Sequence, residues 1–469
     1  MPSKGVQAYT FISAPGCEVE YSVPGNQLTR NELNTFFNDH FEVDKSHISG
    51  LHFTGKFSFT VRKDGQELTT QDVEVNSMTG NLEGGTMNVM AQQVTINKGD
   101  VLVCYCFYDA GTGLAGLPNA HQCNVTVTPN HCDWMGQVAP PGSPQAGQRF
   151  SKLVIPAAHD MGMNSMQTPD ELIQKVGGPY LETLQGALKV FADATAKVGT
   201  EIALKLAPNI ICALAITQKD PLPNVLDLGA RYFEFRPAHI FDKFKPYCGL
   251  PDELYFMHGP IPGMLYKQFL GDVVSFLQAH PNEIVIVHHR WDGVPGECAH
   301  PNDQELNDVL NGAVGPTNGA IHPGNLDDLL NRTIDELRQQ GKRLIVIPPT
   351  DNYSTYTDEG NATLNGDSII AEFEKLNPDV VGGRAFATIQ CQATASNIKD
   401  VIIHSVMASN ASNSCLLATK PICDSKTLPW IRQNALGRLQ PEKLTVIMND
   451  FFDGATAEVA IGLSKERLG

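Results

Sequence analysis

The chain has 469 residues, of which 42% are hydrophobic and 18% are charged, a composition typical of an ordinary globular protein with more than one compact core. Its formal net charge of −17 argues against a nucleic-acid-binding protein, which needs a basic surface to neutralise phosphates. The same charge argues against broad electrostatic attachment to anionic lipids, so any membrane contact would have to be local and apolar.

No apolar run is long enough to predict a membrane-spanning helix, and the first residues lack the apolar core of a secretory signal. We therefore expect a protein that is either cytoplasmic or secreted with its signal removed. The oligomeric state is not specified. The eleven cysteines are odd in number and irregularly spaced, so they do not form a disulfide pattern.

Residues 1–135 predict an all-β sandwich domain. Short segments of alternating apolar and polar residues are separated by turns about every ten residues, and the turn at Lys63-Asp64-Gly65 is a hairpin signal. Cys104 and Cys106 would share one face of a strand, which favours packing over metal binding. The position of this domain fits either a module that docks lipid or a protein partner, or a packing domain without a ligand.

Residues 136–148 are rich in proline and glycine and read as a linker. Residues 149–469 then alternate short apolar runs with amphipathic helical stretches, such as Tyr266 to Ala279 and Asn325 to Gln340. Buried strands that alternate with helices indicate a parallel sheet, and six or more of them favour a TIM-like α/β barrel. A doubly wound open sheet is the alternative, although no glycine-rich phosphate loop follows the first strand.

Ionisable side chains follow the apolar runs at the point where each expected strand ends. The six runs are KLVIPAAHD, ARYFEFRP, ELYFMHG, EIVIVHHRWD, RLIVIPPTD and KLTVIMNDF. Their terminal polar residues are His159, Asp160, Glu234, Arg236, His258, His288, His289, Arg290, Asp292, Asp351 and Asp450. A barrel has its active site at the carboxyl ends of its strands, so these residues are the candidates for one site.

Two histidines with carboxylates and an arginine suit the cleavage of a phosphodiester. One imidazole accepts a proton from the attacking hydroxyl, the other protonates the leaving oxygen, and a guanidinium neutralises the phosphate. A single histidine after a strand is more often structural, and the Asp160–Arg236 and Glu234–Arg236 combinations could be ordinary ion pairs that close one end of the barrel. His288 and His289 are adjacent in a strand and face opposite ways, so at most one can point into the barrel.

Four blocks resemble the phosphatidylinositol-specific phospholipase C X-domain superfamily. They are LVIPAAHDMGM, VLDLGARYFEFRP, LYFMHGP with the helix and strand after it, and VIMNDFF, in the order found in the family. The resemblance spans about residues 150 to 455. It implies a TIM-like barrel and a phospholipase C-type phosphodiesterase, which acts on phosphatidylinositol by default and forms a cyclic phosphate.

The resemblance also assigns roles. It implies that His159 is the general base with Asp450 as its carboxylate partner, and that His258 is the general acid supported by Asp160. Arg236 corresponds to the phosphate-binding arginine of metal-independent members, so we expect no cofactor and disfavour calcium. Glu234 stands in place of an aspartate in the motif.

Other positions depart from the family pattern and leave the headgroup open. Ala157-Ala158 and Met161 flank the His-Asp pair where Gly-Thr and Ser are usual. Candidate headgroup ligands are Arg290, Tyr353 and Tyr356. The alternatives are a phosphodiesterase of the same fold that acts on another headgroup or a soluble diester, and an inactive barrel that serves as a binding protein.

A long insertion at residues 168–222 is expected to form amphipathic helices. These helices either pack on the barrel or form a cap beside the active-site mouth that helps an acidic protein touch lipid. Peripheral membrane contact with a phospholipid substrate is therefore expected, and binding of nucleic acid is not.

Overall fold

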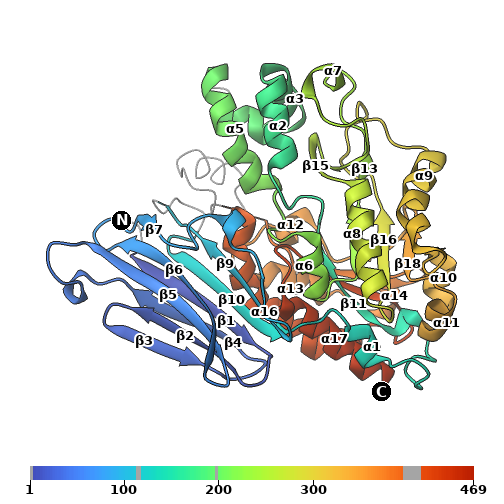
Figure 1. The fold of residues 1–469 in the computed structure, drawn as a ribbon, viewed down its shortest axis with the longest axis horizontal. Helices are drawn as coiled ribbons and strands as arrows, with labels where there is room; N and C mark the ends of the chain where they lie inside the picture. Colours follow the sequence, from blue (N-terminus) through green and yellow to red (C-terminus); the bar gives the residue numbers. More distant parts are fainter. Residues whose placement is uncertain (1–3, 112–117, 196–198, 395–413) are drawn as a thin grey trace.

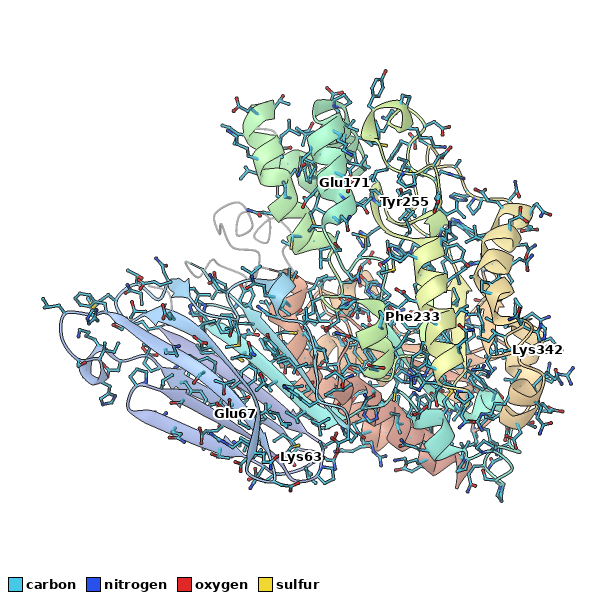
Figure 2. All side chains as sticks on the ribbon, viewed as in Figure 1. Lys63, Glu67, Glu171, Phe233, Tyr255 and Lys342 are labelled. Carbon is cyan, nitrogen blue, oxygen red and sulfur yellow. The ribbon has the colours of Figure 1, made fainter. Side chains whose placement is uncertain are left out.

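The computed structural model describes residues 4–111, 118–195, 199–394 and 414–469, which form a strand-rich N-terminal part beside a larger α/β part (Figure 1). Figure 2 shows Lys63 and Glu67 on the N-terminal strands and Lys342 on the opposite side of the molecule. No helix among these residues is both long enough and apolar enough to cross a membrane.

Two five-stranded sheets make up the N-terminal part and enclose one apolar core. The first sheet has the order β4 (Phe36–Glu42), β1 (Gly5–Ile12), β10 (His121–Pro129), β9 (Val101–Tyr108) and β8 (Ile96–Asn97). The second has the order β3 (Asn26–Arg30), β2 (Cys17–Val23), β5 (Thr54–Lys63), β6 (Gln66–Asn76) and β7 (Leu82–Gly84).

Strand β9 is buried along its whole length because both of its faces are covered. Val103 and Phe107 face the core between the two sheets. Cys104 and Cys106 alternate with them and face the core of the α/β part, so the two cysteines do share a face, as the period of a strand requires.

Eight strands of the α/β part form one sheet in which every neighbouring pair is parallel. The order is β17 (Pro323–Gly324), β18 (Leu344–Ile347), β16 (Val285–His289), β12 (Tyr232–Phe235), β11 (Val154–Ala158), β21 (Thr445–Asn449), β20 (Ala387–Gln390) and β19 (Tyr353–Ser354). The short strands β17 and β19 are its edges.

The sheet is strongly curled but is not a closed barrel within the part of the chain that the structure describes. Tyr232 of β12 and Phe386 next to β20 have ring centroids 5.9 Å apart, although two strands separate theirs in the sheet. The two rings can meet only if the sheet bends around its inner face. The parallel α/β sheet is thus confirmed, whereas closure of the barrel is not.

One expected strand lies outside this sheet. Strand β14 (Tyr255–His258) forms an antiparallel sheet with β13 (Pro237–Ala238) and β15 (Ile261–Leu265). The reason is local: β13 follows β12 directly, and Gly259, with a φ of +58°, begins a tight return into β15. The expectation that β14 joins the parallel sheet was wrong.

Helices cover the outer face of the curled sheet and form the insertion. On the outer face lie α8 (Tyr266–Ala279), α9 (Asp303–Val314), α10 (Leu326–Asn331) and α11 (Ile334–Gln339), with α16 (Cys415–Arg438) and α17 (Gly454–Leu468) between the sheet and the N-terminal part. Between β11 and β12 come α2 (Gln167–Val176), α3 (Gly178–Ala187), α4 (Lys189–Thr195), α5 (Thr200–Ala215) and α6 (Leu222–Asp227).

The range Asn325 to Gln340, expected to be one helix, holds two short ones because its sequence contains two capping signals. Asn325 caps α10 and Thr333 caps α11, each through a reciprocal capping box. Three smaller helices connect other elements: α1 (Trp134–Val138), α7 (Lys245–Cys248) and α13 (Asp367–Phe373).

A buried ion pair joins the N-terminal part to the start of β12. Arg231 and Glu283 are fully buried and lie 2.8 Å apart. The remaining guanidinium donors of Arg231 bond to the backbone oxygens of Leu226, Ala230, His131 and Cys132. The guanidinium therefore holds the end of the N-terminal part against the strand that leads to the candidate site.

Replacing Arg231 with methionine should lower the free energy of unfolding by about 3–5 kcal/mol, because Glu283 would remain buried without its cation. Chemical denaturation measures this change. The matched control is Arg332→Met, which removes an exposed arginine 3.7 Å from Asp328 and should cost less than about 1 kcal/mol. Equal effects of the two variants would show that the Arg231 pair has no special structural role.

Candidate active site

The carboxyl ends of three adjacent parallel strands bring most of the candidate residues together. His159 and Asp160 follow β11, Arg236 follows β12, and Asp450 follows β21. His258 is the last residue of β14, and that strand is held to β12 by a hydrogen bond from the Met257 N–H to the Arg236 carbonyl. Strand order and one hairpin thus assemble the site.

The Asp160 carboxylate is the centre of the arrangement. It is 1% exposed, and its two oxygens lie 3.1 and 3.0 Å from the two terminal nitrogens of Arg236. The Nε2 atoms of His159 and His258 lie 3.6 and 3.7 Å from one of these oxygens. One buried carboxylate therefore faces a guanidinium and two imidazoles at once.

Asp160 also has an unusual backbone, with a φ of +43°. Phe451, which follows Asp450, has the same positive φ and donates its N–H to the Thr217 carbonyl. Non-glycine residues rarely adopt this conformation, and such strain is concentrated at functional sites. Strained turns thus carry the side chains at both of these strand ends.

His159 is held in one orientation by Asp450, whose carboxylate lies 2.7 Å from Nδ1. The other nitrogen, Nε2, is left for the cavity. Burial by itself lowers the pKa of His159, but Asp160 and Asp450 raise it to about 9. Burial likewise raises the pKa of Asp450, and His159 opposes that change. In this geometry His159 is the imidazole that holds a proton at neutral pH.

His258 has the opposite electrostatic environment. Burial lowers its pKa to about 4, because the attraction of Asp160 is outweighed by burial together with the nearby charges of Arg236 and His159. The pKa of Asp160 would be raised by burial, but Arg236 and the two histidines lower it to about 2. At neutral pH the two imidazoles therefore carry one positive charge between them, and that charge is on His159.

A second ion-pair group lies beside the first. Arg290 contacts Glu234 at 3.0 Å and Asp292 at 2.5 Å. Burial would lower the pKa of Arg290, but these carboxylates raise it. Both arginines near the site thus already have carboxylate partners, which fixes the planes of their guanidinium groups.

These groups line a cavity of about 490 Å³, which is within the range of small-molecule sites. The predicted residues that line it are His159, Asp160, Glu234, Arg236, His258, Arg290, Asp292, Tyr356 and Asp450. Tyr353 does not line the cavity; its ring packs against an apolar cluster next to α13. Tyr353 therefore has a structural position rather than the headgroup position that its sequence suggested.

The strand histidines His288 and His289 face opposite sides of the sheet, as predicted. His288 bonds to Tyr232 inside the curl, and His289 bonds to Tyr266 of α8 on the outer face. Burial lowers the pKa of the two residues to about 3 and about 4. Neither lines the cavity.

Sequence reasoning missed the neutral polar wall of the cavity. It consists of Asn352, Ser354, Gln390 and Gln392. Gln392 is 3% exposed, and its Oε1 has no hydrogen-bond partner. Strand β20 ends in Gln390, a polar residue after an apolar run, so a search for amides as well as ionisable residues would have found it.

Arg236 lies 3.0 Å from Asp160, the most buried carboxylate of the cavity, and a guanidinium at this position would repel a metal cation. Among the described residues, one other group brings metal-binding atoms within 4.8 Å of one another: Cys132, Asp133 and His280. That group does not line the cavity. Partly exposed groups of this kind are common without a metal.

Comparison with known proteins finds no family model that matches the chain. A segment of 74 residues is 40% identical to the PI-PLC X domain-containing protein 1 of Danio rerio. The segment is 16% of this chain and 22% of that protein, so the match covers about a fifth of the relative's length.

Two solved structures show a partial likeness in shape. The phosphatidylinositol-specific phospholipase C from Listeria monocytogenes has 12% identity and a TM-score of 0.39, over 71% of this chain and 98% of that chain. A pentafluoro-Phe-containing form of the Staphylococcus aureus enzyme has 13% identity and a TM-score of 0.41, over 71% and 98%. The 74-residue segment is thus similar to a PI-PLC X-domain protein, which supports the superfamily that the motifs resemble.

Proposed function

We propose that this protein is a phosphodiesterase of the phospholipase C type that works with the histidine pair His159 and His258. The observation that supports this most is the convergence of both Nε2 atoms on Asp160, beside Arg236, in one cavity. Acid–base catalysis needs one imidazole that is protonated and one that is neutral, and the opposite pKa shifts of His159 and His258 favour these two states.

The diester phosphate would bind beside Arg236. Its guanidinium is oriented by Asp160 and can neutralise charge on the non-bridging oxygens. A phosphate between the two imidazoles would have an attacking oxygen near one ring and a leaving oxygen near the other. Such positioning removes much of the entropic barrier to the reaction.

The wall of neutral amides and hydroxyls suits a headgroup that carries hydroxyls. Gln390 and Gln392 offer donors and acceptors without charge, and Tyr356 lies at the same cavity. A hydroxyl next to the ester oxygen can attack phosphorus, which releases diacylglycerol and leaves a cyclic phosphate. Phosphatidylinositol meets this requirement and is the substrate we propose, with peripheral contact to the membrane that holds it.

The charges of the two rings give a second indication of which ring is the base and which is the acid. The family resemblance implies that His159 is the base and His258 the acid. The pKa directions favour the reverse in the free site, where His258 is neutral and His159 is protonated. A bound phosphate anion raises the pKa of both rings. An experiment that varies the leaving group of the substrate must therefore decide which ring is the acid and which is the base.

His159→Ala and His258→Ala should each reduce diester cleavage by about 10²–10⁴-fold, because each removes one proton-transfer step. Phosphorus NMR of phosphatidylinositol vesicles measures the loss and detects a cyclic product. The control is His322→Ala, an exposed histidine outside the cavity, which should retain activity. An active variant of either cavity histidine would exclude the two-histidine mechanism. The unmodified protein should also be tested with other phospholipids and with soluble diesters. If it cleaves none of them, the phosphodiesterase proposal fails and the alternative of an inactive binding protein is favoured.

A substrate with sulfur in place of the leaving oxygen distinguishes the acid from the base. A thiolate leaves without protonation, so the variant that lacks the acid should regain most of its activity with this substrate, whereas the variant that lacks the base should not. Rescue of His258→Ala supports the division implied by the family, and rescue of His159→Ala supports the reverse. Rescue of both or of neither would contradict a division of roles.

The pKa of His159 should fall when Asp450 is replaced by asparagine, because one of the two carboxylates that raise it is lost. In the unmodified protein kcat/KM should decline as the pH rises through about 9, where His159 loses its proton, and as it falls through about 4, where His258 gains one. NMR titration of the His159 ring in Asp450→Asn measures the shift directly. An unchanged pKa would show that Asp450 does not support the charge of His159.

We also propose that cleavage needs no metal ion, with Arg236 in the place that a cation would take. Activity should therefore be unchanged in EDTA, and Arg236→Lys should lose about tenfold or more because a lysine cannot hold two phosphate oxygens with one planar group. A loss in EDTA that calcium restores would overturn this proposal.

A further inference from the structure

A second cavity lies between the N-terminal strands and the helical insertion. Its volume is about 530 Å³, and none of the residues that line it lines the catalytic cavity. Most of its lining is apolar, and includes Met90, Met166, Cys212 and Ile216. Sites for small ligands have this size and character.

One charged group in this wall lacks a partner. Asp170 of α2 lines the cavity, and its Oδ1 is buried without a hydrogen bond. Within the described part of the chain, no cationic group lies within 4.0 Å of its carboxylate, and burial raises its pKa. Asp170 is partly buried in the first turn of α2, and a bound cation would offset the cost of placing its charge beside an apolar wall.

Two neighbouring polar side chains, by contrast, already have partners within the protein. The Lys219 ammonium donates to the Gln93 carbonyl and to Asp220. The Asn164 amide donates to the Asp220 carbonyl. Asp170 is thus the group in this wall that a ligand with a positive head would satisfy.

The two cavities share a thin wall. Along the end of α5 and the loop after it, Cys212, Ile216 and Gln218 line the second cavity, while Leu214 and Thr217 line the catalytic one. The Gln218 amide donates to the His159 carbonyl at 2.8 Å and accepts from the Phe452 N–H at 2.8 Å. Gln218 therefore connects the wall of the second cavity to the backbone of His159.

We infer that the second cavity binds a single-chain amphiphile with a cationic head, with the chain against the apolar wall and the head beside Asp170, and that its occupancy alters the environment of His159 through Gln218. This binding does not depend on the proposed phosphodiesterase activity. Direct binding measurements therefore test it even if no diester is cleaved.

The test uses decylammonium below its micelle concentration, with 1-decanol and decyl sulfate as probes of the same chain length. Calorimetry should show one decylammonium bound per chain, 1-decanol bound more weakly, and decyl sulfate bound most weakly. Asp170→Asn should reduce the affinity for decylammonium about tenfold or more and leave 1-decanol little changed, since the variant removes charge at nearly constant size. Cys212→Trp should abolish binding of all three because the indole fills the cavity.

The matched control is Asp272→Asn on α8, which removes another partly buried carboxyl whose pKa is raised but which does not line this cavity. This variant should bind decylammonium like the unmodified protein. If Cys212→Trp does not fold, the comparison of Asp170→Asn with Asp272→Asn still decides whether decylammonium binds beside Asp170. Equal affinity for decylammonium and decyl sulfate, or no loss in Asp170→Asn, would overturn the assignment of the site.

The coupling to His159 has its own readout. NMR of the His159 ring should show a shifted signal or an altered pKa when decylammonium saturates the site, and Gln218→Ala should remove that response without abolishing binding. Binding that leaves the His159 signal unchanged would overturn the coupling.

Discussion

The site depends on one buried carboxylate that contacts three basic side chains. Asp160 is 1% exposed and lies within 3.7 Å of the nearest nitrogens of Arg236, His159 and His258. A buried carboxylate stays ionised only when a cation lies next to it, and Arg236 is that cation for Asp160. The same charge then separates the two imidazoles, because His159 has a second carboxylate in Asp450 and His258 does not.

The surrounding structure keeps that geometry. Strands β11, β12 and β21 are neighbours, so their ends carry Asp160, Arg236 and Asp450 to one edge without any long loop. Behind this edge Asn449 donates to Asp424, and Asp424 in turn pairs with Lys420 of α16. A buried polar network of this kind fixes the strand end from which Asp450 projects.

The N-terminal strands are joined to the same region by buried polar contacts. Thr95 donates its backbone N–H and its hydroxyl to Asp220, two residues after Gln218. Gln218 in turn holds the backbone of His159. The strand-rich part is therefore a structural support of the candidate site.

The sequence by itself determined the polar strand ends and their order along the chain. A parallel strand buried on both faces needs a continuous apolar run, and its first polar residue marks its end, so His159, Arg236 and Asp450 could be predicted to meet. Helix α8 was predictable at both ends for a similar reason, since its apolar period is unbroken. Two capping signals within residues 325–340 divided an expected helix and were present in the sequence but not used.

Only the tertiary structure decided how far the sheet curls, which strands pair, and which nitrogen faces which oxygen. Local pattern cannot distinguish β14 in a hairpin from β14 in the parallel sheet, because both bury the same apolar side chains. Local pattern also cannot show that Tyr353 packs against an apolar cluster while Gln392 lines the cavity, since these positions depend on contacts between distant segments. The charges of the two histidines follow from such contacts as well, because distances of a few ångströms to Asp160 and Asp450 set their pKa values and have no local signature.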